Sequence, residues 1–262
     1  MYVRLILGTP WGFPLTTWPH KSLAGSRQKP LSAGRFPLGT PAFAELRLGA
    51  PLIEIPNFKS QIPKFGLRKN TMKKVIIVHG WGGYPEKIWF PWLKNELEDL
   101  DFSVLTPQLP DPETPTIENW LHALNTVITN PDEKTFLVGH SLGCQTIIRY
   151  LEGLPGNIKI GGTVFVAGFF DRLTNMNDSE NKIAEPWLKT PINFDLVKSH
   201  LKTSTAIFSD NDPFVPLDEQ NNFRNKLGSK IVVKSSAGHF SEETKTTELP
   251  IVLEEILKIS SK

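Results

Sequence analysis

Near the middle of the 262-residue chain stands the sequence Thr135-Phe136-Leu137-Val138-Gly139-His140-Ser141-Leu142-Gly143. The run 135–138 is a nearly continuous apolar stretch, which is typical of a strand buried on both faces. From residue 142 to 151 apolar side chains recur three and four positions apart, which predicts a helix. A tight turn between the two elements needs small residues, and Gly139 and Gly143 bracket Ser141 accordingly. The alternative is an ordinary glycine-bounded turn in which the serine is incidental.

Similar apolar runs alternate with helical patterns from residue 72 to the end of the chain. The predicted strands are 75–78, 102–105, 135–138, 163–167, 205–209 and 231–233. The predicted helices are 89–100, 116–128, 142–151, 217–227 and 249–259. Uninterrupted apolar strands that alternate with helices indicate a parallel sheet covered on both faces. The sequence therefore predicts an α/β fold with three layers around a mostly parallel, doubly wound sheet.

Residues 1–71 differ in composition from the rest of the chain. They hold nine of the 22 prolines, ten of the 29 Lys and Arg, and two of the 27 Asp and Glu. Prolines at this density interrupt every candidate element, so we expect a basic, mostly disordered extension before a domain at 72–262. Three interpretations stay open: a true start at Met72 after a translated leader or gene-model artefact, an organelle transit peptide, or a tail that binds nucleic acid or anionic lipid.

The composition argues against several classes of protein. Cys144 is the only cysteine, so the chain cannot form an internal disulfide, which fits a cytoplasmic location. No run approaches the ~20 apolar residues that span a bilayer. No pair of histidines has the helical spacing of metal ligands. We therefore expect no membrane span, no metal or other cofactor, and no nucleic acid bound to the folded domain.

A serine hydroxyl becomes a strong nucleophile only when a base removes its proton, and a carboxylate must orient that base. In folds with a serine at a strand-to-helix turn, the acid and then the histidine follow it in the chain. Asp212 and His239 each follow a predicted strand, so we expect both at the same edge of the sheet as Ser141. Asp210 competes for the role of the acid. We favour Asp212, because Pro213 and Pro216 follow it in a pattern that resembles the acid loop of many folds with such a serine turn. His140 is expected to pack against the core rather than to act as a base.

A glycine-rich loop with the sequence Val78-His79-Gly80-Trp81-Gly82-Gly83 follows the first predicted strand. Such a loop beside a nucleophile can donate backbone N–H groups to the oxyanion of a tetrahedral intermediate. We expect the two donors to be the N–H groups of Leu142 and Trp81. The alternatives are a dinucleotide-binding loop, whose glycine spacing and acidic partner are missing, and a plain flexible turn.

Aromatic residues near these loops are candidates for a substrate pocket: Trp81, Trp89, Trp92, Trp187 and Phe240. Of these, Trp187 and Phe240 are the two that we expect to line it. The alternative is that the tryptophans belong to the hydrophobic core. The segment 169–190 is too short and polar for a roomy cap, which favours a small or exposed acyl group over a long lipid.

From Lys73 onward the sequence resembles the small serine hydrolases related to the retinoblastoma-binding protein and to bacterial YdeN-type hydrolases. The resemblance rests on the serine turn, the glycine-rich loop, and the segments 107–112, 117–120, 185–187, 210–216 and 238–240. It implies a compact α/β-hydrolase without a large lid, a Ser141–Asp212–His239 triad, and cleavage of a small ester or amide. Residues 1–71 have no counterpart in that family. The alternative from another class is a protein-interaction module that keeps the fold without catalysis.

Overall fold

The computed structural model describes residues 72–261, and the expectation of an extension at 1–71 lies outside these residues. Six strands form one sheet in the order β2-β1-β3-β4-β5-β6, and every neighbouring pair is parallel. They are β1 (Lys74–Val78), β2 (Ser103–Leu105), β3 (Thr135–His140), β4 (Gly162–Val166), β5 (Ser204–Ser209) and β6 (Lys230–Lys234). Each corresponds to a predicted strand, and the ends agree within two residues.

Helices follow the strands in alternation. They are α1 (Phe90–Glu98), α2 (Ile117–Val127), α3 (Leu142–Glu152), α4 (Asp178–Lys189), α5 (Phe194–His200), α6 (Glu219–Leu227) and α7 (Pro250–Ser260). The predicted helices correspond to α1, α2, α3, α6 and α7, whereas the sequence patterns do not predict α4 and α5. The reason is local, because α4 is polar and contains Pro186, and α5 has only seven residues.

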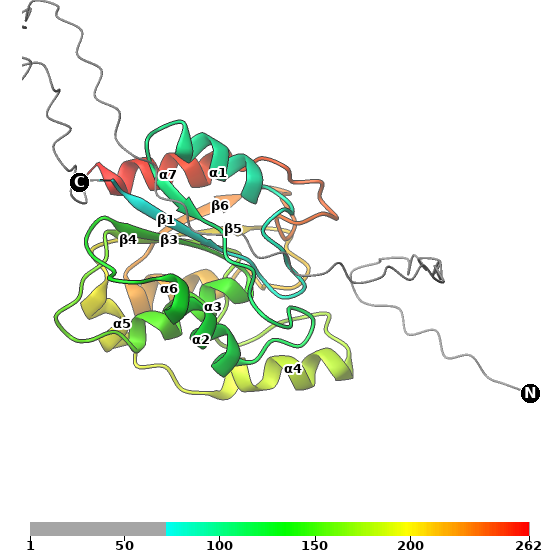
Figure 1. Ribbon diagram of the computed structural model, residues 1–262. Helices are drawn as coiled ribbons and strands as arrows, with labels where there is room; N and C mark the ends of the chain where they lie inside the picture. The colour runs from blue at the N-terminus through cyan, green and yellow to red at the C-terminus, as the bar shows by residue number, and fades with distance from the viewer. Residues whose placement is uncertain (1–71, 262) are drawn as a thin grey trace, which may run out of the picture. The chain divides into compact units, whose positions relative to one another are not determined.

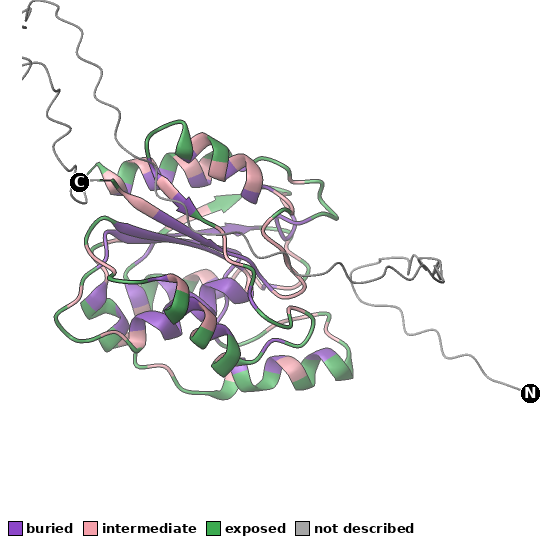
Figure 2. Ribbon diagram, viewed as in Figure 1, coloured by how far each residue is buried: buried purple, intermediate pink, exposed green. Residues whose placement is uncertain are grey.

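The helices cover both faces of the sheet, α1 and α7 on one side and α2 to α6 on the other (Figure 1). Successive strand residues point to opposite faces, which divides the core in two. Ile76 and Leu137 pack in the core below α2, α3 and α6, and Val75 and Phe136 pack in the core below α1 and α7. The central strands β1, β3, β4 and β5 are buried along nearly all of their length, whereas the edge strands β2 and β6 are largely accessible (Figure 2). The helix α3 is buried on nearly every side.

The order of the strands indicates which edge of the sheet is the candidate ligand site. β1 pairs with β2 on one side and with β3 on the other, so the chain reverses its direction across the sheet at β1. The loops that follow β1 and β3 therefore leave the carboxyl edge of the sheet beside each other. Open α/β sheets bind their ligands at this type of switch point. The glycine-rich loop and the serine turn are the two loops that meet there.

The segment between β4 and α5 contains a single helix, α4, and no large lid. Ala184 and Trp187 on this helix are buried, so α4 packs against the domain instead of standing away from it. The guanidinium of Arg149 on α3 donates to the carbonyls of Trp187 and Thr190, both at 2.9 Å, and so holds the C-terminal end of α4. No helix among residues 72–261 is long and apolar enough to cross a bilayer.

Candidate active site

Ser141 lies in the turn between β3 and α3, in a backbone conformation that side chains rarely adopt. Its φ is 52° and its ψ is −121°, and its N–H donates to the carbonyl of Val166 at 2.8 Å. The turn packs closely against the end of β1. A Cβ atom on Gly143 would lie only 2.4 Å from the carbonyl oxygen of Val78. This strained strand-turn-helix is the geometry of a nucleophile elbow, in which the serine is held at the end of the sheet.

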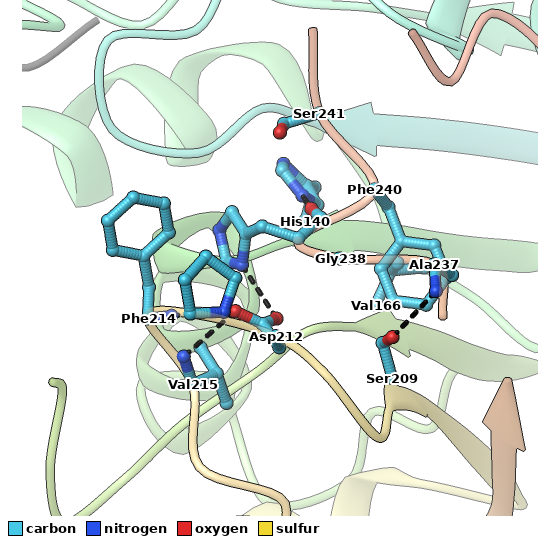
Figure 3. A network of polar contacts seen from close by, with 12 residues as sticks. His140, Val166, Ser209, Asp212, Phe214, Val215, Ala237, Gly238, Phe240 and Ser241 are labelled. Atoms are coloured by element: carbon cyan, nitrogen blue, oxygen red, sulfur yellow. Dashed lines mark hydrogen bonds and ion pairs between the residues drawn. The ribbon is translucent and has the colours of Figure 1, made fainter. Parts of the chain in front are cut away.

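His239 and Asp212 form a hydrogen-bonded pair at the same edge of the sheet. Figure 3 shows Asp212 with the hydrogen bonds of its carboxylate. His239 Nδ1 lies 2.8 Å from Asp212 Oδ2, and the two side chains are 4% and 2% exposed. The other carboxylate oxygen of Asp212 accepts the backbone N–H groups of Phe214 at 2.9 Å and Val215 at 3.0 Å. Because a carboxylate accepts, Nδ1 of His239 carries the hydrogen, and Nε2 keeps a lone pair that can take a proton.

Asp210, the competing acid, has a different partner. Its carboxylate accepts the backbone N–H of Ser236 at 2.7 Å, and this hydrogen bond lowers the pKa of Asp210. The side chain is exposed at the surface of the loop that follows β5. The hydrogen bond to His239 thus belongs to Asp212, the residue favoured from the sequence.

The loops that carry Asp212 and His239 are joined by further hydrogen bonds. Asn211 Oδ1 accepts the N–H of Gly238 at 2.8 Å, and Ser209 Oγ accepts the N–H of Ala237 at 3.0 Å. Ser209 Oγ also donates to Asn211 Oδ1 at 2.8 Å. Side chains from the end of β5 therefore fix the backbone of the loop that carries the histidine (Figure 3).

The glycine-rich loop after β1 lies directly against the serine turn. A Cβ atom on Gly80 would lie 2.9 Å from the Cβ of Ser141, so only glycine allows this approach. The N–H groups of Trp81 and Leu142, the two expected oxyanion donors, donate no hydrogen bond within residues 72–261. Both donors are therefore available to a ligand at the serine.

A histidine at the start of this loop sets the direction of its peptides. His79 Nε2 accepts the N–H of Leu109 at 3.0 Å, so the hydrogen is on Nδ1, which donates to the carbonyl of Gly80 at 2.8 Å. The N–H of Gly83 donates to the same carbonyl at 3.1 Å. In a trans peptide the N–H points opposite to the carbonyl, so the N–H of Trp81 is directed away from His79 and Gly83. Burial lowers the pKa of His79, which keeps the ring neutral.

A proline-rich loop after β2 is held against this site by three indole groups, an arrangement that the sequence analysis missed. Each indole N–H donates to a backbone carbonyl of the loop: Trp81 to Glu113 at 3.0 Å, Trp120 to Pro110 at 2.8 Å and Trp187 to Pro115 at 3.2 Å. Proline removes backbone donors from such a loop, so its carbonyls need donors from side chains. Only Trp120 lies near this segment in the sequence, so the sequence offered a signal for one of the three hydrogen bonds and none for the other two.

The structure corrects the expected pocket residues. Trp187 is 1% exposed and Phe240 is 0% exposed, and each belongs to one of the two hydrophobic cores. Trp89 is also buried, and only Trp81 and Trp92 of the four tryptophans considered are partly exposed. A side chain without accessible surface does not line an open pocket. The core alternative therefore holds for Trp187 and Trp89, because large aromatic groups gain most from complete burial.

A family model described as serine hydrolase matches residues 75–258. The chain belongs to the serine hydrolase family. The protein YdeN of Bacillus subtilis is 30% identical over 192 residues, which cover 72% of this chain and 97% of YdeN. The serine hydrolase RBBP9 of Rattus norvegicus is 29% identical over 187 residues, which cover 70% of this chain and 95% of RBBP9. The family resemblance seen in the sequence is thereby confirmed.

Solved structures agree with this family. The crystal structure of the ydeN gene product from B. subtilis matches this serine hydrolase with a TM-score of 0.68 at 29% identity, covering 73% of this chain and 100% of that chain. Est1E from Butyrivibrio proteoclasticus has the same fold, with a TM-score of 0.55 at 17% identity over 73% of this chain and 89% of its own. The predicted α/β-hydrolase fold is confirmed. The chain is an enzyme, a serine hydrolase, rather than the interaction module that was the alternative.

Proposed function

We propose that this serine hydrolase cleaves a small ester or amide through an acyl-enzyme on a triad of Ser141, His239 and Asp212. The proposal is carried by the buried pair of Asp212 and His239, which leaves one imidazole nitrogen free to act as a base beside a nucleophile elbow. A buried carboxylate is costly unless hydrogen bonds compensate for its lost hydration, and the two backbone N–H groups and His239 Nδ1–H do so for Asp212 in one fixed orientation. Hydrolysis by a serine needs this orientation of the base.

The first half of the reaction forms the acyl-enzyme. Nε2 of His239 takes the proton from Oγ of Ser141 while Oγ attacks the carbonyl carbon of the substrate. The carbonyl oxygen becomes an oxyanion, to which the N–H groups of Trp81 and Leu142 donate. Each such donor contributes on the order of 10²–10³ in rate. The bond to the leaving group then breaks, and the leaving alcohol or amine takes the proton from Nε2.

The second half releases the acid. Nε2 of His239 takes a proton from water while the oxygen of that water attacks the acyl carbon. The oxyanion forms again between the same two donors, the bond to Ser141 Oγ breaks, and Nε2 returns the proton to Oγ. Asp212 holds the Nδ1–H tautomer and stabilises the imidazolium that exists in each half.

A small acyl group is favoured because the segment above the sheet is a single packed helix. Trp187 of α4 is buried in the core and its indole N–H is bound to Pro115, so α4 offers no wide cavity for a long chain. We expect kcat/KM to fall as the acyl chain of a nitrophenyl ester panel is lengthened from acetate to laurate. Matched amides and thioesters of the preferred acyl group distinguish an esterase from an amidase or a thioesterase.

A fluorophosphonate probe tests the triad on the full-length chain. The wild type should be labelled at a single serine, and Ser141→Ala should abolish the label and hydrolysis. Ser199→Ala, at an exposed position of α5, is the matched control and should keep both. A folded wild-type protein that is not labelled, or a label that persists in Ser141→Ala, contradicts the proposal. A cytoplasmic location stays a prediction.

A further inference from the structure

His140 precedes Ser141 in the chain, and its side chain contacts the loop of the base. Nε2 of His140 lies 2.8 Å from the backbone carbonyl oxygen of His239. Because a carbonyl only accepts, Nε2 of His140 carries the hydrogen and donates it. His140 is the last residue of β3, so this donor stands on the rigid strand that also presents the nucleophile (Figure 3).

The loop that contains His239 needs such a restraint. The residues on either side of His239, namely Gly238 and Phe240, have φ values of 54° and 53°, in the left-handed region. For Phe240 this conformation is strained, and it persists only where the surroundings enforce it. The carbonyl of Phe240 accepts the indole N–H of Trp89 at 3.2 Å, so two successive carbonyls of this loop are held by side chains.

The two histidine rings are also in contact. The ring centroids of His140 and His239 lie 4.9 Å apart, and Phe214 packs edge-on at 5.3 Å from His239. The rings of Trp89 and Phe90 are steeply inclined to the ring of His140, with centroids 6.0 and 6.1 Å from its centroid. Aromatic groups therefore enclose His140, and its orientation is fixed by packing as well as by its hydrogen bond.

His140 is unsuited to be a base itself. Burial, together with the neighbouring His239, lowers the pKa of His140 to about 3. The ring therefore stays neutral while His239 is protonated during turnover. A neutral ring that keeps Nε2–H as a donor holds the carbonyl of His239 in both protonation states of the base.

We propose that His140 is a positioning residue, whose Nε2–H fixes the backbone of His239 relative to the serine to which His140 is directly bonded. This inference rests on the proposed triad. It gives the second position of the elbow a task in the reaction, because this hydrogen bond connects the strand of the nucleophile directly to the backbone of the base, in addition to the contacts from Ser209, Asn211 and Trp89. A displacement of about 1 Å between reacting groups can cost on the order of 10²-fold in rate.

A pair of amide variants separates the hydrogen bond from packing. In His140→Gln the amide nitrogen reaches the place of Nε2, whereas in His140→Asn the shorter side chain reaches only the place of Nδ1. We expect kcat of His140→Asn to fall on the order of 10–100-fold, with KM changed by less than about threefold. His140→Gln should recover most of kcat. His122→Asn, on the exposed side of α2, is the control and should match the wild type.

Equal kcat values for His140→Gln and His140→Asn, whether both normal or both low, overturn the inference, since a packing role does not distinguish the two amides. A second measurement uses the unaltered protein, so that it holds even where a variant does not fold. The ¹⁵N chemical shifts of His140 should show a neutral ring protonated at Nε2 from pH 5 to 9. Protonation at Nδ1 contradicts the inference. Failure of the wild type to react with the fluorophosphonate contradicts the triad instead.

Discussion

Asp212 Oδ2 and His239 Nδ1 lie 2.8 Å apart at the ends of two neighbouring strands, β5 and β6, in a region from which water is almost fully excluded. The backbone N–H groups of Phe214 and Val215 hold the second oxygen of the carboxylate. In the proposed triad this geometry suits the carboxylate to fix the tautomer and orientation of the imidazole and to stabilise the imidazolium.

Substitution of each aspartate in turn should therefore show which of Asp212 and Asp210 orients the base. In Asp212→Asn the amide offers the wrong group to Nδ1, and kcat should fall on the order of 10⁴-fold through loss of the productive tautomer. Asp210→Asn keeps an oxygen for the N–H of Ser236 and should leave kcat near the wild-type value. Steady-state kinetics on a nitrophenyl ester measures both. If kcat falls more in Asp210→Asn than in Asp212→Asn, the acid of the triad is Asp210 and the assignment to Asp212 is wrong.

The oxyanion loop should depend on His79. His79→Phe keeps a ring in the core but removes both hydrogen bonds that connect Leu109, the ring and Gly80. The peptide before Trp81 then loses part of its orientation, and kcat should fall on the order of tenfold to a hundredfold. A trifluoromethyl ketone forms a tetrahedral adduct with an oxyanion, and its ¹⁹F signal should titrate at higher pH in the variant. An unchanged titration shows that the loop does not need His79.

Acid should destabilise the protein partly through His140. Its pKa is about 3 in the folded protein and near the ordinary 6.5 in the unfolded chain, so between these values the unfolded chain binds the proton. Stability from this group is complete above pH 6.5 and is lost as the pH falls toward 3. At pH 5 the loss is about 2 kcal/mol. Urea unfolding at pH 7 and pH 5 measures this loss. The free energy of unfolding should decrease less between the two pH values in His140→Gln than in the wild type, and equal decreases contradict a role of His140.

The C-terminal end of α4 should loosen without Arg149. Arg149→Met preserves the length of the side chain but leaves the carbonyls of Trp187 and Thr190 without their donor. We expect the free energy of unfolding to fall by about 2 kcal/mol. Amide hydrogen exchange should accelerate in α4 and not in α2. Uniform acceleration across both helices indicates general destabilisation instead of local release.

A chain that begins at Met72 should fold and hydrolyse like the full-length chain. The strands, the helices and the proposed triad all lie within 72–261, and the family model begins at residue 75. The free energy of unfolding should agree within about 0.5 kcal/mol, as for changes outside a core. Circular dichroism and ester hydrolysis compare the two chains. A shorter chain that aggregates or loses activity shows that residues 1–71 contribute to the domain.

The strands and the order of the site residues could be predicted because they follow from short-range patterns. Apolar runs mark buried strands, and the carboxyl ends of parallel strands meet at one edge, so Asp212 and His239 could be placed near Ser141 from the sequence. The end of β3 differs from the prediction. The strand continues to His140, two residues beyond its apolar run, because its pairing with β4 extends to His140 and Val166.

The missed features have two different causes, one local and one that depends on contacts between distant parts of the chain. α4 begins with a capping box in which Asn177 and Glu180 hold each other's backbone N–H, a signal that is readable in the sequence. Pro186 and the polar composition concealed it. Burial of Trp187 and Phe240 could not be predicted, since an aromatic residue near a site is compatible with a pocket or with the core until its neighbours are known.

The strand order has a consequence for synthesis of the protein on the ribosome. β1 emerges first and finds both of its partners, β2 and β3, by residue 140, so the centre of the sheet can assemble early. Ser141 emerges about a hundred residues before His239, which follows the last strand. If the proposed triad is correct, a nascent chain carries the nucleophile before its base has been synthesised. We therefore expect no hydrolysis from a nascent chain until His239 has been added and has folded beside Ser141.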